Sequence, residues 1–190
     1  MVNFMKKKMI LIDIIKNALN ISNDIKIKYF DIRKILKYIN FDNEILKIGS
    51  GTYSHVYKIG DKVLKIGLAK LNEKIIKSPF IVKTYFKKNI LIKSKKIKLI
   101  IGIEIQEYAK KIIISEAELY KFYETVRDNG IIWRDVKPEN IGVLNNKIVI
   151  IDTDYIYKKG KNKSNIQFFS VLDKKFDFIY YNNIRNNRRK

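Results

Sequence analysis

The first forty residues place apolar side chains at helical spacing. Between residues 5 and 39 these side chains recur three or four positions apart, which predicts a buried face on each of two helices. Residues 20–23 interrupt the pattern, and Ser22 or Asn23 is a suitable start for the second helix. Core packing is the simpler role for these faces, and an interaction surface is the alternative. The spacing is carried by Ile10, Ile14, Ile15, Leu19, Ile32, Ile35, Leu36 and Ile39.

From residue 44 onward the pattern changes to short apolar runs typical of strands. Gly60 and Asp61 separate two of these runs and predict a hairpin turn. A polar and apolar stretch beginning at Leu71 is predicted to form a short helix between the third and fourth strands. The strands are predicted at residues 44–48, 56–59, 62–66, 81–93 and 97–105.

A third helix is predicted in the second half of the chain. Ser115 followed three residues later by Glu118 matches a capping box, in which each residue satisfies an amide of the other. Gly130 follows the polar pair Asp128 and Asn129 and ends this helix. Its apolar face consists of Leu119, Phe122, Tyr123 and Val126.

The remaining residues predict a hairpin and a helical end. Two apolar runs at 141–144 and 148–151 flank Asn145 and Asn146, which suit a tight turn. Residues 155–190 are predicted to form one or two helices that cover this half of the molecule. Helices and strands that alternate in this way indicate an α+β protein.

Composition limits the possible chemistry. The chain has 190 residues, which is near the size of one domain, and it contains no cysteine and one histidine, His55. Disulfides and thiolate metal sites are therefore excluded, and a zinc site built on one histidine is not expected. No apolar stretch has the length of a membrane span, and Asp13 interrupts the only run that resembles a signal peptide.

The formal net charge of +21 comes from 40 Lys and Arg against 19 Asp and Glu. Lysines on solvated faces, encoded by a biased genome, explain this charge most simply. Attraction to an acidic partner, whether nucleic acid, anionic lipid or an acidic protein, is the alternative.

Two clusters of polar residues follow apolar runs in the second half. The first is the sequence Trp-Arg-Asp-Val-Lys-Pro-Glu-Asn at 133–140, in which Asp135 and Asn140 are five positions apart. The second is Asp152, Thr153 and Asp154, which directly follow the apolar run 148–151. Upstream, Gly49 and Gly51 stand between two predicted strands, where glycine lets backbone N–H groups close over a phosphate without a Cβ in the way.

In this order the parts resemble those of a eukaryotic-type Ser/Thr protein kinase, over residues 45–155. Residues 49–56 resemble the glycine-rich loop, with Ser54 in place of its third glycine, and 133–140 resembles the catalytic loop. The resemblance implies a two-lobed protein-kinase-like fold with a truncated C-terminal lobe and extra N-terminal helices. It implies a helical extension at 1–43 packed on the small lobe, an N-lobe and hinge at 44–109, and a reduced C-lobe at 110–190.

The resemblance implies that the cofactors are ATP and Mg²⁺. Lys65, on a strand that resembles V-A-I-K, would hold the α- and β-phosphates, and Glu73 on the short helix would hold Lys65. No other acidic residue occurs between Lys74 and Ile103. The remaining nucleotide-binding positions implied are Gly49, Ser50, Gly51 and Val56 in the loop and Glu107 and Ala109 at the hinge, with Gln106 as gatekeeper.

The catalytic loop and the second aspartate would carry the chemistry. Asp135 would orient the substrate hydroxyl, and Lys137 would sit near the γ-phosphate. Asn140 and Asp152 would coordinate Mg²⁺, which prefers oxygen ligands.

Three departures from the kinase pattern affect its expected regulation. Trp133 replaces a structural histidine, and Thr153 and Asp154 replace the Phe-Gly of D-F-G. Only 36 residues follow Asp154, and no A-P-E motif is recognisable among them, so we expect a kinase without activation-loop control. Arg134, which usually pairs with a phosphorylated loop, would be left to a local carboxylate such as Asp154.

The predicted function is transfer of the ATP γ-phosphate to Ser or Thr of a protein. The architecture is similar to minimal kinases that bacteria secrete as effectors, which implies a host chaperone, signalling or ubiquitin-pathway protein as substrate; a viral kinase is the other origin. We expect a monomer that works in the cytoplasm, of the host cell if it is an effector. The alternative is a pseudokinase-type module that binds an acidic protein or nucleic acid. A small-molecule phosphotransferase is the third reading.

Overall fold

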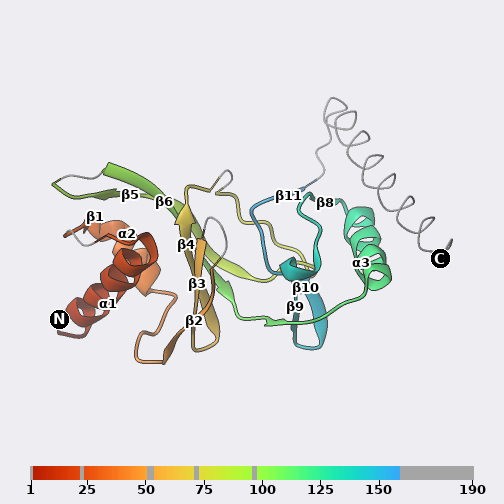
Figure 1. The fold of residues 1–190 in the computed structure, drawn as a ribbon, viewed down its shortest axis with the longest axis horizontal. Coiled ribbons are helices and arrows are strands. Elements are labelled where there is room, and N and C mark those ends of the chain that lie inside the picture. The colour runs from red at the N-terminus through yellow and green to blue at the C-terminus, as the bar shows by residue number, and fades with distance from the viewer. Residues whose placement is uncertain (1, 22–23, 51–53, 71–72, 96–97, 159–190) are drawn as a thin grey trace.

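The computed structural model describes residues 2–21, 24–50, 54–70, 73–95 and 98–158. It has mixed α and β content. Figure 1 shows the helices α1 and α2 with a large sheet in one half of the molecule, and the helix α3 with several short strands in the other half. All described pairings between strands are antiparallel.

The large sheet has six strands in the order β1-β5-β6-β4-β3-β2. Its two longest strands, β5 and β6, pair with each other in the middle of the sheet, and β6 also pairs with β4. The predicted turn at Gly60 is confirmed, since Gly60 has a φ of 60° between β3 and β4. The strands are β1 (Lys26–Ile27), β2 (Ile45–Ser50), β3 (Ser54–Ile59), β4 (Lys62–Leu68), β5 (Thr84–Lys93) and β6 (Lys98–Glu107).

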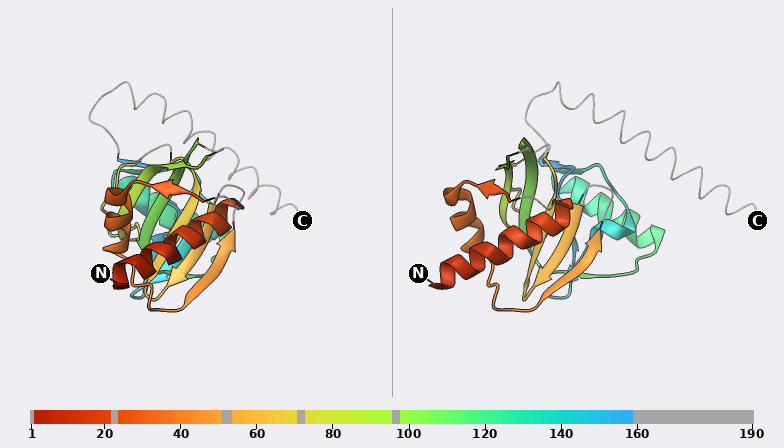
Figure 2. Two further views of the ribbon diagram at one scale, coloured as in Figure 1. Left: turned by 90° about the vertical axis from the view of Figure 1, so that its left-hand side faces the viewer. Right: turned by 60° about the vertical axis from the view of Figure 1, so that its left-hand side comes forward.

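Two helices cover one face of this sheet, as Figure 2 shows for the long first helix. α1 is Val2–Leu19 and α2 is Tyr29–Leu36. The break at Asn20 is confirmed, since Asn20 has a φ of 51°. The predicted start of the second helix at Ser22 or Asn23 is wrong, because the chain first forms β1 and α2 begins at Tyr29.

The apolar side chains of these helices and of the sheet form one core. Residues at alternate positions of β4 and β6 point toward the helices, and the opposite alternate positions face the other half of the molecule. The fully or almost fully buried members of this core include Leu11, Ile15, Ile32, Ile35, Leu64, Ile66, Ile101, Ile103 and Ile105.

α3 (Glu116–Asp128) begins and ends as the sequence predicts. Ser115 is its N-cap, and both hydrogen bonds of the capping box to Glu118 are present. Gly130 follows the helix with a φ of 74°. The buried face of α3 packs against β8 (Ile131–Trp133) in a second core, whose members include Leu119, Tyr123, Val126, Trp133, Ile141 and Ile150.

Short strands complete this half. β9 (Ile141–Leu144) and β10 (Lys147–Ile150) form the predicted hairpin, and Asn145 and Asn146 adopt positive φ values of 50° and 60° at its turn. β7 (Lys110–Lys111) pairs with β9, and β11 (Ile156–Lys158) pairs with β8. Residues 156–158 are therefore a strand, where a helix was predicted from residue 155; residues 159–190 lie outside the described part.

A short bridge links the two halves on the far side from β7. Ile81 forms a parallel bridge with Ile150. The amide of Ile150 donates to the carbonyl of Phe80 at 2.8 Å, and the amide of Val82 donates to the carbonyl of Ile150 at 3.0 Å. This bridge explains why β5 begins at Thr84 and not at the predicted residue 81. None of the described helices is long and apolar enough to cross a membrane.

The capping box should contribute measurably to stability. Replacing Ser115 with Ala removes the hydroxyl that accepts from the Glu118 amide, which leaves a helix N–H without its partner. We expect Ser115→Ala to lower the free energy of unfolding by about 1 kcal/mol, measured by urea denaturation followed by circular dichroism. Lys121→Ala, an exposed change in the same helix, should alter it by less than about 0.5 kcal/mol; equal losses would contradict the capping role.

Candidate functional site

Asp135, Lys137 and Asn140 gather at the turn between β8 and β9. The amide nitrogen of Asn140 donates to the backbone carbonyl of Asp135 at 2.9 Å and to its carboxylate at 2.8 Å. The ammonium of Lys137 lies 2.9 Å from the same carboxylate. A short 3-10 helix, η1 (Pro138–Asn140), closes the loop and places Asn140 under Asp135. The structure therefore brings these three predicted residues together.

Lys137 is held by the acidic side chains around it. The hydrogen bond that Lys137 donates to Asp135 raises the pKa of Lys137 above its ordinary value, and the charge of Asp152 adds to this effect. Since Asp152 acts on Lys137 through space, both aspartates lie close to one ammonium group. Lys137 remains half exposed, so it stays charged and reachable from solvent.

Asp152 is placed beside this loop by β10. The amide of Ile151 donates to the backbone carbonyl of Asn140 at 2.8 Å, which fixes the end of β10 against the loop at 135–140. The amide of Asp154 donates to one carboxylate oxygen of Asp152 at 3.3 Å. Both side-chain hydrogen bonds of Asn140 use its nitrogen, so its carbonyl oxygen and the second oxygen of Asp152 suit a hard cation.

Other metal chemistry has little support among the described residues. They contain no cluster of three or more His, Cys, Asp or Glu side chains that could hold a metal ion by themselves. A cation at Asn140 and Asp152 would need further oxygen ligands, such as phosphate groups and water. That requirement is usual for Mg²⁺.

Lys65 reaches from the large sheet to the same region. Its ammonium donates to the backbone carbonyl of Ile151 at 2.6 Å, directly before Asp152. Lys65 lies opposite Val56 of β3, and Gly49 and Ser50 form the end of β2, opposite Val56 and His55. The loop positions and Lys65 thus share one end of the sheet; Gly51 lies outside the described residues.

The predicted pair between Glu73 and Lys65 is not among the ion pairs of the structure. Residues 73–78 have no helix, and the carboxylate of the exposed Glu73 accepts from the backbone amide of Asn89 at 2.8 Å. The physical reason is local: bonding to the β5 backbone holds this segment in an irregular conformation along the sheet. Helix formation in so short a stretch would also be weak without packing.

The predicted hinge lies at the end of β6. The amide of Glu107 donates to the carbonyl of Lys83, and the amide of Tyr108 donates to the carbonyl of Asp61. Ala109 is buried in a small apolar cluster with Val82 and Val149. The segment is thereby fixed between the two halves of the molecule.

A buried cluster of charges, which the sequence analysis missed, stands behind the site. Lys70 lies 3.3 Å from Glu104 and 2.8 Å from Asp154, and Lys87 lies 3.3 Å from Asp154. The Thr153 hydroxyl donates to Glu104 through a short hydrogen bond. The sequence did contain a signal for this cluster, because Glu104 stands inside the otherwise apolar run at 99–105.

The position of Lys70 depends on a glycine. A Cβ on Gly102 would lie 2.5 Å from the carbonyl oxygen of Leu68 and 2.8 Å from the Lys70 side chain. Only a residue without a side chain lets Lys70 pass over β6 to reach Glu104.

The charges in this cluster stabilise one another. Burial alone would lower the pKa of Lys70, but the charges of Glu104 and Asp154 outweigh it and raise that pKa. Burial would likewise raise the pKa of Asp154, whereas Lys70, Lys87 and Lys65 lower it below its ordinary value of 3.8. Both groups are therefore ionised across the neutral range.

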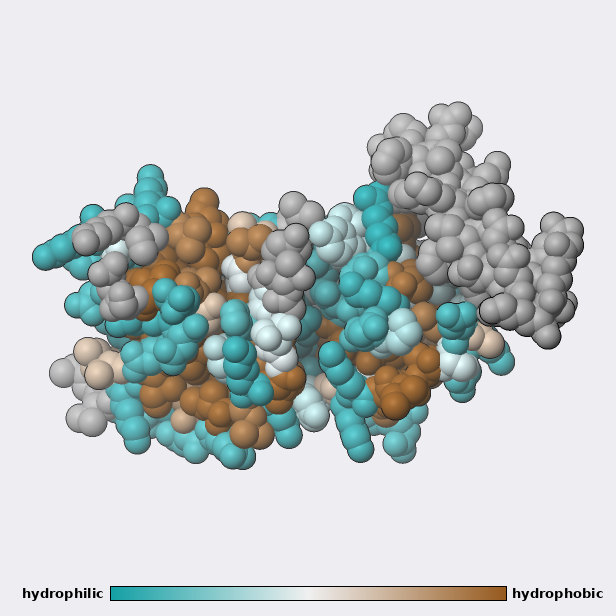
Figure 3. Space-filling view, in the orientation of Figure 1, coloured by the Kyte–Doolittle hydropathy of each residue, from teal (hydrophilic) through white to brown (hydrophobic). Residues whose placement is uncertain are grey.

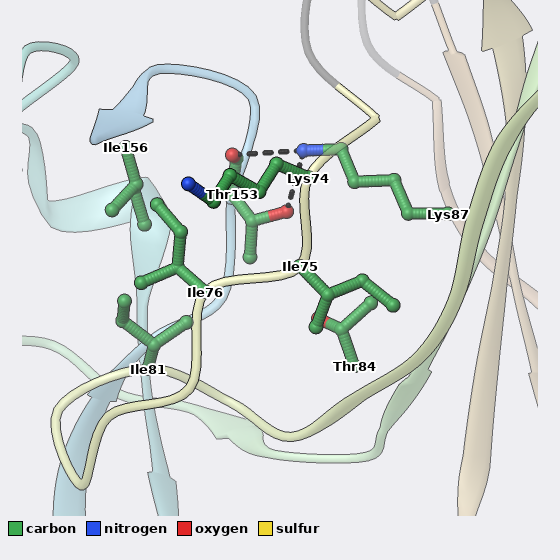
Figure 4. A pocket seen from close by; sticks show the side chains of 8 residues that line it. All are labelled: Lys74, Ile75, Ile76, Ile81, Thr84, Lys87, Thr153 and Ile156. Atoms are coloured by element: carbon green, nitrogen blue, oxygen red, sulfur yellow. Dashed lines mark hydrogen bonds between the residues drawn. The ribbon is translucent and has the colours of Figure 1, made fainter. Parts of the chain in front are cut away.

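A small hollow, with space for about one water molecule, lies beside this cluster. Figure 4 shows Lys87 crossing one side of it to reach the backbone carbonyl and hydroxyl of Thr153, at 3.0 and 3.1 Å. Ile75 and Ile76 line the hollow from the irregular segment after Glu73. Apolar side chains thus shield the lysine from water on this side.

Trp133 and Arg134 take local roles. Trp133 is 2% exposed, and its ring meets that of Phe122 edge to face at 6.1 Å, so it is a core residue. The guanidinium of Arg134 lies over the Tyr157 ring at 5.0 Å. The carboxylate of Asp154, expected near Arg134, forms its ion pairs with Lys70 and Lys87.

Comparison with known proteins adds no assignment: no protein-family model matches this chain, and no curated protein matches its sequence.

Removing Lys70 should destabilise the protein strongly. Lys70→Met leaves the buried carboxylate of Glu104 without its ammonium, and we expect a loss of about 3–5 kcal/mol in the free energy of unfolding. A matched control is Lys7→Met, because Lys7 pairs with Asp42, whose side chain is 58% exposed; its loss should be about 0–1 kcal/mol. Urea denaturation at neutral pH measures both.

The same difference should not depend on pH near neutrality. Because the pKa of Lys70 is raised, its charge contributes to folding stability at every pH below 10.5. Because the pKa of Asp154 is lowered, its charge contributes at every pH above 3.8. The contribution of Lys70 is lost only as the pH rises through its pKa in the folded protein. The contribution of Asp154 is lost only as the pH falls through its own. The loss in Lys70→Met should stay constant between about pH 5 and about pH 9; a clear slope there would contradict ionised partners.

Proposed function

We propose that this protein is an ATP- and Mg²⁺-dependent protein Ser/Thr kinase with a protein-kinase-like, two-lobed arrangement. The observation that carries the proposal is the convergence of Asp135, Lys137, Asn140 and Asp152 at one end of the sheet that bears Lys65. The resemblance of the motifs supports it independently, since the same residues were selected from the sequence. The proposed substrate is a hydroxyl side chain of another protein.

The residues divide the work of phosphoryl transfer among themselves. Asp135, held by Asn140 and Lys137, accepts a hydrogen bond from the attacking hydroxyl and orients it. Lys137 is charged and lies 2.9 Å from the Asp135 carboxylate, so it would meet the γ-phosphate beside the attacking hydroxyl. Lys65, whose ammonium donates to the Ile151 carbonyl, would hold the α- and β-phosphates of bound ATP. When bound at Asn140 and Asp152, Mg²⁺ supplies positive charge to the phosphate oxygens.

The proposal includes activity without phosphorylation in an activation loop. The turn after Asp152 is already tied to the sheet through Asp154 and Thr153. A phosphorylated segment normally supplies such order through new contacts to arginine. Here lysines and a buried glutamate supply comparable contacts without modification.

Phosphoryl transfer should fail when single members of the site are removed. Asp135→Asn should lower the rate of autophosphorylation and of phosphorylation of a generic Ser/Thr substrate by about 10²–10⁴-fold, because it loses the group that orients the hydroxyl. Lys65→Ala and Asp152→Ala should reduce incorporation from labelled ATP to background. Lys88→Ala, outside the site, should retain the wild-type rate. Equal incorporation in all four variants would overturn the proposal.

A second candidate function rests on one surface feature. Lys26, Lys93 and Lys98 lie directly opposite one another across β1, β5 and β6, all exposed and on one face. Like charges in such a row repel, so a bound polyanion would stabilise it. Figure 3 shows hydrophilic side chains over much of the visible surface, consistent with the charge of +21. This row favours a module that captures an acidic protein or nucleic acid.

Salt dependence separates this candidate from the kinase. Binding to short single-stranded DNA should weaken steeply with salt, and changing Lys26, Lys93 and Lys98 to Gln should reduce the log–log salt slope by about two. The control variant changes Lys111, Lys121 and Lys147 to Gln, three exposed lysines of the other half. An equal loss in both variants, or no binding at low salt, would rule out the row as a docking site.

A further inference from the structure

Glu104 occupies the position where a partner for Lys65 is needed. It lies directly opposite Lys65 across β4 and β6, and directly opposite Lys87 across β5 and β6. Residues in such register share one face of a sheet, here the face that carries the site. Glu104 is fully buried, whereas Glu73 is exposed and bonded to the backbone of β5.

The carboxylate of Glu104 is tied to the turn that follows Asp152. One of its oxygens accepts from the Thr153 hydroxyl and from the amide of Gln106, the latter at 2.8 Å. The other oxygen lies 3.3 Å from Lys70, whose ammonium also lies 2.8 Å from Asp154. Glu104 thereby binds Thr153 directly and is linked to Asp154 through Lys70.

Lys87 fastens the same turn from the neighbouring strand. Its ammonium donates to the backbone carbonyl and hydroxyl of Thr153 and lies 3.3 Å from Asp154. The amide of Asp154 in turn donates to the carboxylate of Asp152. A displacement of Thr153 or Asp154 would therefore change the hydrogen bond that orients the Asp152 carboxylate.

We propose that Glu104, with Lys70 and Lys87, is the positioning group of the site. It holds the Asp152 turn on the sheet, whereas the sequence analysis predicted a single acidic residue, Glu73 on a short helix, as the partner of Lys65. This inference rests on the proposed phosphotransfer function. Because the carboxylate belongs to a central strand and not to a mobile helix, the metal-binding aspartate is held in place at all times.

A pair of substitutions at Thr153 tests this role with little change of shape. Thr153→Val removes the hydroxyl that joins Glu104 and Lys87, and Thr153→Ser keeps it. We expect Thr153→Val to raise the Mg²⁺ concentration for half-maximal rate and to lower kcat, each by about tenfold, with a smaller change in the KM for ATP. Thr153→Ser should behave like the wild type in all three quantities.

Glu104→Gln and a matched carboxylate provide the second arm. Glu104→Gln should shift the Mg²⁺ requirement in the same direction as Thr153→Val. Asp31→Asn removes an equally buried carboxylate that pairs with Lys88 beneath α2, so it should lower thermal stability and leave the Mg²⁺ requirement unchanged. If Glu104→Gln does not fold, the two Thr153 variants decide the matter alone.

The outcomes distinguish this inference from the proposed function. An active wild type with unchanged Mg²⁺ requirement and kcat in Thr153→Val overturns the positioning role alone. A shift of equal size in Asp31→Asn also overturns it, because the effect would then follow general stability. A wild type that neither binds Mg²⁺ with ATP nor transfers phosphate overturns the proposed function and the positioning role together.

Discussion

Burial of a carboxylate in the middle of a sheet is the constraint on which the site depends. Glu104 is removed from water entirely, and a charge in such a place is costly unless cations and hydrogen-bond donors surround it. The structure supplies them from three segments: Lys70 after β4, Gln106 on the same strand as Glu104, and Thr153 after β10. Gly102 leaves the space that the Lys70 side chain occupies, which a Cβ at that position would fill. Satisfying one buried charge thus fixes the relation between the sheet and the turn after β10.

Local patterns allowed much of the fold to be predicted. The capping box at Ser115, the glycine turn at Gly60 and the paired asparagines at Asn145 and Asn146 depend on neighbouring residues, and each is confirmed. The loop at Asp135 and Asn140 was found for the same reason, since its hydrogen bonds join residues five positions apart. Such features can be recognised in a single sequence because the interacting residues are close together along the chain.

The errors occurred where partners are distant in sequence. The short helix at Glu73 was predicted from local composition, but a backbone amide of β5 decides its conformation. The strand β1 replaced the expected helix start because Lys26 and Ile27 pair with residues more than sixty positions later. Glu104 stood inside a predicted strand and Lys70 was given no role, and only the fold brings their charges together, because Lys70 reaches Glu104 from beyond the end of β4.

Trp133 has a practical consequence for the study of this molecule. It is the only tryptophan in the chain, it is buried at the end of β8, and it directly precedes Arg134 and Asp135. Its indole nitrogen has no hydrogen-bond partner in the described structure, so its emission should respond to any rearrangement that brings a polar group or water nearby. The unmodified protein therefore carries an intrinsic optical reporter within its own candidate site, readable in real time without a dye or label.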